Sequence, residues 1–130
     1  MPAASSFSYA TIRVVPRVER EEFINVGVVL HCPAQAYLGA RVALDRARVL
    51  AVFPGLDAHE VERHLQWLCA LCTGDAAAGP LAALSTSERF HFIVASRSTV
   101  VQTSPVHAGL TSDPEGTLTR LLDLMVGNPA

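Results

Sequence analysis

Near the N-terminus, two stretches of the chain have hydrophobic residues at every second position. Residues 7–15 are rich in β-branched side chains, which favour a strand. Pro16 ends this stretch, because proline has no N–H group to donate to a neighbouring strand. Residues 22–31 form the second stretch, and the charged residues 17–21 between the two are typical of a turn. The pattern therefore predicts an antiparallel hairpin.

The middle of the chain combines strand-like and helical patterns. Residues 36–44 predict a weaker third strand, whereas residues 45–53 fit either a short helix or a strand. Residues 58–74 have one apolar face at helical spacing, and Asp57 before them is a good N-cap. These features predict a helix, and the small residues that follow it as far as Ser87 predict a loop.

The last third of the chain predicts a second hairpin and a final helix. Residues 89–95 and 99–104 are strand-like, with residues 96–98 as the tip of the hairpin. Residues 112–115, Ser-Asp-Pro-Glu, combine a cap, an early proline and an acidic residue, which is typical of a helix start. An apolar stripe follows, and Gly127 ends the predicted helix.

Two sets of strands, each followed by a helix, predict an α+β fold. We expect an antiparallel sheet of about five strands with two main helices packed on one face. The 130 residues suffice for one domain that buries about two-thirds of its unfolded surface. We place this domain at residues 7–127, between a frayed tail at residues 1–6 and a short tail at residues 128–130.

Composition narrows the classes of function. Half of the residues are hydrophobic, so apolar surface left exposed would mark a contact site. The chain has no lysine and a net charge of −2, without the basic excess of a nucleic-acid-binding protein, and we expect no nucleic acid partner. Arg41, Arg46 and Arg48 form a short basic cluster, but Asp45 lies within it, which indicates a solvated face.

The sequence also bears on the compartment. No apolar run reaches the roughly 18 residues that a membrane span needs. The first residues lack the basic and apolar segments of a signal peptide. Three cysteines are an odd number and suggest no disulfide framework. We therefore expect a cytoplasmic protein with free thiols and no membrane partner.

The predicted first hairpin has one apolar face and one mixed face. If its turn centres on Glu19, Arg13 lies across from Asn25, and Thr11 lies across from Gly27. A glycine within a strand often marks a bulge or the close approach of another group. A guanidinium beside an amide suits recognition of a carboxylate, a phosphate or a peptide strand, although a cross-strand polar pair can also simply stabilise a sheet. The apolar face consists of Ile12, Val14, Ile24, Val26, Val28 and Leu30, and the candidate binding residues are Arg13, Glu22, Asn25, Gly27 and His31.

Histidines and cysteines on the first predicted helix do not have the spacing of a metal or redox site. His59 and His64 are five residues apart and do not share a helix face. Cys69 and Cys72 form a C-x-x-C pair in the last turn, where the helix dipole opposes a thiolate. We therefore expect neither a metal nor a cofactor.

Several of these residues resemble the signature of a bacterial family of unknown function. Its members open with a pattern like Y-x-x-x-R-x-x-P, followed by G-E-F-x-N-V-G-V; residues 103–106 and 113–126 are similar to its closing segments. This chain has Glu21 where members often have glycine. The resemblance implies a small companion or regulator of HipA-type kinase-like proteins, beside which members are often encoded, and it implies no catalytic residue. The residues that carry it are Tyr9, Arg13, Pro16, Glu22, Phe23 and the run Asn25-Val26-Gly27-Val28.

Two hypotheses about function follow. The first is a non-enzymatic domain that binds another protein, either a HipA-type kinase-like neighbour or a second copy of itself. The second is an enzyme or ligand-binding domain that holds an anionic small molecule at Arg13, with Glu22 or His31 as acid or base. The second hypothesis predicts a concave pocket around Arg13 and a shifted pKa for Glu22 or His31.

Overall fold

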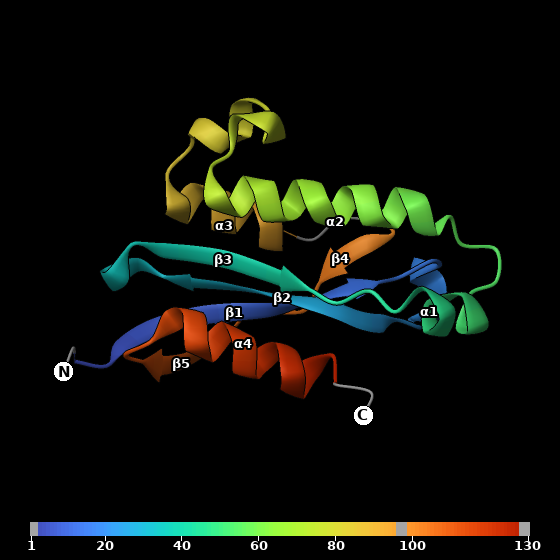
Figure 1. Ribbon diagram of the computed structural model, residues 1–130, viewed down its shortest axis with the longest axis horizontal. Helices are drawn as coiled ribbons and strands as arrows, with labels where there is room; N and C mark the ends of the chain where they lie inside the picture. The colour runs from blue at the N-terminus through green and yellow to red at the C-terminus, as the bar shows by residue number, and fades with distance from the viewer. Residues whose placement is uncertain (1–2, 96–98, 128–130) are drawn as a thin grey trace.

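The computed structural model describes residues 3–95 and 99–127, which form an antiparallel sheet with helices on both faces (Figure 1). In the sheet, β3 pairs with β2 and β2 with β1, while β4 and β5 both pair with the far edge of β1. The predicted α+β class and five-stranded antiparallel sheet are confirmed. The strands are β1 (Ser5–Val14), β2 (Ile24–Cys32), β3 (Tyr37–Val42), β4 (Val101–Thr103) and β5 (His107–Thr111), and the helices are α1 (Arg46–Val52), α2 (Ala58–Thr73), α3 (Thr86–Val94) and α4 (Pro114–Met125).

The layers differ from the predicted arrangement, in which both main helices share one face. In Figure 1, α2 and α3 lie above the sheet and α4 lies below it. Each face has its own apolar cluster. The α2 face is packed by residues such as Ile12, Val29 and Leu65. The smaller cluster on the α4 face comprises Phe7, Val28, Leu30, Cys32 and Leu118.

The long helices begin and end where the sequence predicts. Asp57 accepts a hydrogen bond from the backbone N–H of Glu60, which caps α2, and Gly74 ends this helix with a left-handed φ of 74°. Asp113 caps α4 in the same way through Gly116. The ambiguous residues 45–53 contain α1, because the Asp45 carboxylate accepts from the N–H of Arg48 and so starts a helix.

The predicted second hairpin is wrong in its first strand. Residues 89–94 belong to α3, whose start is a capping box between Ser85 and Glu88. The alternating aromatic residues of this segment resemble a strand, but the capping box provides local hydrogen bonds that favour a helix. The predicted second strand contains β4, and the predicted tip at residues 96–98 lies outside the described residues.

Strand β5 was not predicted. Between β4 and β5, Ser104 continues the hydrogen bonding to β1. The backbone N–H of Ser104 donates to the carbonyl of Thr11, and the Ser104 hydroxyl accepts from the N–H of Thr11, both at 2.9 Å. Pairing with β1 therefore continues past β4, although Pro105 follows and has no N–H to donate.

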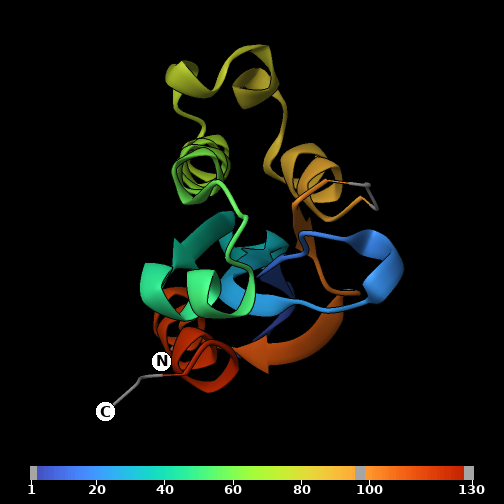
Figure 2. The same cartoon turned by 90° about the vertical axis from the view of Figure 1, so that its right-hand side faces the viewer.

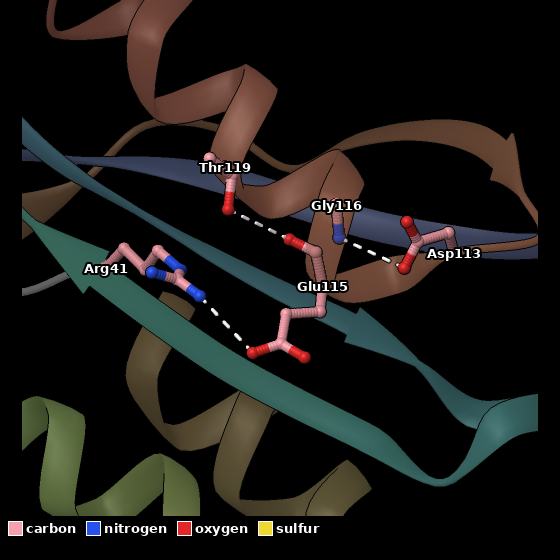
Figure 3. A network of polar contacts seen from close by, with 5 residues as sticks. All are labelled: Arg41, Asp113, Glu115, Gly116 and Thr119. Carbon is pink, nitrogen blue, oxygen red and sulfur yellow. Dashed lines mark hydrogen bonds and ion pairs between the residues drawn. The ribbon is translucent and has the colours of Figure 1, made fainter.

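Polar contacts surround the start of α4, and one of them joins this helix to the sheet (Figure 3). The guanidinium of Arg41 on β3 lies 3.3 Å from the carboxylate of Glu115 in the first turn of α4. Thr119 donates to the carbonyl of Glu115 one turn later.

A second arginine of the short basic cluster, Arg46, pairs with Glu62 at 3.0 Å. Two of the three arginines thus have partners within the chain.

Candidate functional site

A β-bulge at Val26 decides which side chains of the first hairpin share a face. Arg13 pairs with Asn25 as predicted, but Ile12 pairs with Gly27, so Val26 is left over on β2. One extra residue reverses the alternation of side chains beyond the bulge. The predicted apolar face is therefore wrong: Val26 packs on the α2 face, whereas Val28 packs on the α4 face. The predicted pairing of Thr11 with Gly27 is wrong for the same reason.

Gly27 is a packing residue at this bulge. A Cβ atom at Gly27 would lie 2.7 Å from the backbone oxygen of Arg41 and 2.9 Å from a side-chain carbon of Val42, both at the end of β3. Real Cβ atoms do not approach a backbone oxygen so closely. The glycine thus permits the close approach of a neighbouring strand, one of the two features that its position in the sequence indicated, and it lies next to the bulge residue Val26.

His31 lies in the core rather than on the candidate surface. Only 5% of the residue is exposed, and its ring centroid is 5.1 Å from that of Phe90 on α3. Its Nε2 atom is buried and has no hydrogen-bond partner among the described residues. Burial lowers the pKa of His31, and the nearby His91 lowers it further. The hypothesis that His31 acts as an acid or base predicted a shifted pKa. The pKa of His31 is lowered here because the side chain is buried against α3.

Arg13 and Phe23 form a stacked pair near the turn end of the hairpin. The Cζ atom of Arg13 lies 3.8 Å from the centroid of the Phe23 ring, and Phe23 is 44% exposed. The guanidinium donates to the Thr11 hydroxyl at 3.5 Å, and its buried Nε atom has no acceptor in the described part of the chain. Burial lowers the pKa of Arg13. Arg13 makes no ion pair with any residue that the structure describes.

Asn25 connects the hairpin to the end of α4. Its Nδ2 atom donates to the carbonyl of Met125 at 3.1 Å, which satisfies one of the free carbonyls of the helix C-terminus. Within residues 3–95 and 99–127, its buried Oδ1 atom has no donor, just as the buried Nε atom of Arg13 has no acceptor. Arg13 and Asn25 therefore lie opposite each other as predicted, and each retains unmatched hydrogen-bonding capacity.

The turn of the hairpin, residues 15–23, contains the remaining candidate residue. Glu22 pairs with Arg20, and not with Arg13, and both side chains are largely exposed. Glu21 has a left-handed φ of 55°. Glycine adopts this conformation without strain, so a glycine would suit this position. The turn forms here with a glutamate in this conformation.

The turn of the hairpin borders a groove of about 580 Å³. Figure 2 looks onto this end of the molecule, where the hairpin turn and α1 both face the viewer. The far wall is the connection from α1 to α2, so the groove brings together segments that are far apart in the sequence. Its apolar lining consists of Pro16, Val52, Phe53, Pro54, Leu56 and Val100, and its charged lining consists of Arg17, Arg20, Glu22 and Asp57.

Sequence reasoning found Glu22 but missed the rest of the groove. The only local signal was the break at Pro54-Gly55, which marked a loop without indicating a surface. Of the five candidate residues, the structure places Arg13 and Asn25 together on the α4 face and Glu22 at the groove. It places Gly27 and His31 in the interior. Arg13 and His31 do not line the groove.

The cysteines and histidines of α2 do not gather into a site. Among the residues that the structure describes, no three His, Cys, Asp or Glu side chains are arranged to hold a metal ion. Cys32, Cys69 and Cys72 are free, and burial raises the pKa of Cys72 to about 12. Cys72 is therefore a thiol that packs in the core. No helix within residues 3–95 and 99–127 has the length and apolar character to cross a membrane.

The fold and this site define a small α+β domain with a two-sided sheet and a groove at the turn end of its first hairpin. The chain belongs to the family described as "Protein of unknown function (DUF3037)", which matches residues 9–126. The expectation of a family without a settled activity is therefore confirmed. The comparisons with curated proteins and with solved structures found no match.

Proposed function

We propose that this protein is a protein-binding domain, and that its docking surface is the turn end of the first hairpin. We call this surface the hairpin end. The groove supports the proposal more than any other single observation, because it combines an apolar lining with a charged rim. Protein interfaces combine a dry apolar centre with a polar rim in the same way. The hairpin end comprises the groove-lining residues and Phe23.

Exposed hydrophobic side chains support the same surface. Phe23, Val52 and Val100 are 44%, 53% and 40% exposed, and all three lie at the hairpin end. Large apolar side chains that gather at one end of a soluble domain mark a contact surface. Stacking on Arg13 also holds the Phe23 ring in place, so a partner would lose little side-chain entropy by contacting it.

The identity of the partner rests on the family resemblance. Because similar proteins are often encoded beside HipA-type kinase-like proteins, a protein of that type is the first partner to test. In such a pair this chain would act as a companion or regulator rather than as an enzyme. Its three free cysteines fit a reducing compartment such as the cytoplasm.

The test is a calorimetric titration of the purified chain with a purified HipA-type kinase-like protein. We expect Val52→Asp, Val100→Asp and Phe23→Ala each to weaken binding at least about tenfold, since each removes an apolar contact. Leu124→Asp is the control, because Leu124 is 76% exposed on α4 and does not line the groove. Circular dichroism checks that each variant folds. Equal binding by all four variants would exclude the hairpin end as the docking surface.

Anion binding at Arg13 is the second candidate function. It is supported by a guanidinium that has no carboxylate partner among the described residues and an Nε atom without an acceptor. Against it, Arg13 does not line the groove, and Phe23 covers its guanidinium. If this second function is correct, a small carboxylate such as acetate should raise the thermal unfolding temperature of the wild type. It should not raise that of Arg13→Lys, which lacks the planar guanidinium.

A further inference from the structure

Strand β5 leaves one edge of the sheet open. It pairs with β1 over five consecutive residues, and no strand in the described part of the chain pairs with its other edge. Figure 2 shows β5 at the outer margin of the sheet. His107, Ala108 and Leu110 are exposed, and Leu110 has 72% of its surface in contact with solvent. Alternate residues of such a strand direct free N–H and C=O groups outward.

The other edge strands carry features that prevent pairing with a second chain, whereas β5 carries none. Charged side chains, short length and cover by helices are the usual protections. Strand β3 carries Arg41, and β4 is only three residues long and contacts α2 and α3. Strand β5, in contrast, contains no Asp, Glu, Lys, Arg or Pro, and its register with β1 has no bulge.

We propose that β5 pairs antiparallel with β5 of a second copy of this chain, which joins two sheets into one across a two-fold axis. An interface of this kind must be complementary to itself. With Gly109 at the axis, Leu110 lies beside the partner's Ala108, and no charged side chain of β5 faces a like charge. The nearest charged residue, Asp113, lies across from the partner's Pro105 and is engaged in capping α4.

The two faces of β5 explain which side chains the dimer would cover. His107 stacks on Tyr9, and Gly109 leaves room for the ring of Phe7, which packs in the α4-face cluster. Ala108 and Leu110 alternate with these residues and point to the other face. In the dimer, Leu110 gains apolar neighbours there. Because a five-residue strand buries little surface, the dimer is weak and forms with rising concentration.

The test is sedimentation equilibrium of the whole chain over a wide range of concentration. We expect a reversible monomer–dimer equilibrium for the wild type. In Ala108→Lys/Leu110→Lys, like charges face each other across the axis, and dimerisation should weaken at least about tenfold. In Ala108→Glu/Leu110→Lys, opposite charges face each other in the proposed register, and the dimer should persist at low salt and weaken at high salt.

Leu124→Lys adds a charge at an exposed apolar position on α4 and should leave the equilibrium unchanged. Circular dichroism shows whether each variant keeps its fold. A wild type that stays monomeric at every concentration, or a doubly lysine-substituted chain that dimerises like the wild type, would overturn the proposal. A dimer lost in Leu124→Lys would place the contact on α4 instead. Because β5 is separate from the hairpin end, this result does not depend on the proposed function.

Discussion

At the scale of single residues, the backbone of the first hairpin limits which residue types fit at two positions. Glu21 adopts a left-handed φ of 55°, a conformation that costs a non-glycine residue roughly 1–2 kcal/mol. Gly27 is constrained differently, because the backbone of β3 occupies the space that a side chain would need. The shape of the hairpin therefore constrains both positions.

We predict that Glu21→Gly stabilises the protein. The substitution relieves the left-handed strain at a small cost in chain entropy, for a net gain of about 0.5–1 kcal/mol. Urea denaturation measures the free energy of unfolding. Glu19→Gly is the matched control, since Glu19 lies in a 3-10 turn without a positive φ and should lose stability instead. A loss of stability in Glu21→Gly would contradict the strain that we infer.

At the scale of elements, short-range hydrogen bonds start the helices, and one long-range contact satisfies backbone carbonyls in the last turn of α2. The buried guanidinium of Arg89 on α3 donates to the carbonyls of Leu71 and Cys72 in the last turn of α2, at 3.0 and 3.3 Å. A cation at a helix C-terminus complements the helix dipole. Gly74 beside it has no Cβ, and an added Cβ would lie 2.6 Å from the same guanidinium.

Arg89→Ala should lower the free energy of unfolding by about 2–4 kcal/mol, because two buried carbonyls lose a charged donor. Arg89→Met keeps most of the apolar stem, so its loss of stability isolates the contribution of the hydrogen bonds. Thermal or urea denaturation provides the measurement. Arg63→Ala removes only an exposed ion pair with Glu60 and should change stability by at most about 0.5 kcal/mol. Similar losses in Arg63→Ala and Arg89→Ala would refute this account of α2.

At the scale of the whole molecule, the sheet separates two apolar clusters, and the bulge assigns residues of β2 to one or the other. Beyond Val26, the bulge turns Val29 and His31 toward α2 and α3. Val28 and Leu30 turn toward α4 instead. The buried imidazole of His31 is therefore a consequence of the layered arrangement, and it makes stability depend on pH.

Stability should decrease as the pH falls below 6.5, the ordinary pKa of histidine, toward the lower pKa of His31 in the folded protein. In that window the unfolded chain binds a proton that the folded protein excludes, so His31 contributes a slope of at most about 1.4 kcal/mol per pH unit. Urea denaturation at several pH values measures the slope. His31→Leu should flatten it, whereas His59→Gln, an exposed site, should not. Equal slopes in the wild type and His31→Leu would exclude this role.

The candidate site was predictable only in part. Arg13 opposite Asn25 follows from the length of the turn, and the glycine at position 27 correctly indicated a bulge or a close contact. The inward orientation of His31 could not be predicted, because it depends on the position of one unpaired residue. Helix α3 could have been recognised, since Ser85 and Glu88 form a capping box in the sequence.

The sequence by itself determined the hairpin, the α+β class, and helices α2 and α4. The signals involved act over a few residues: a proline that ends a strand, or an aspartate that caps an N–H group three residues ahead. Only the tertiary structure decided which face each helix covers, where β5 pairs, and how the hairpin turn, the connection from α1 to α2 and Val100 enclose a groove. These features depend on strand register and on contacts between distant segments, which no local pattern specifies.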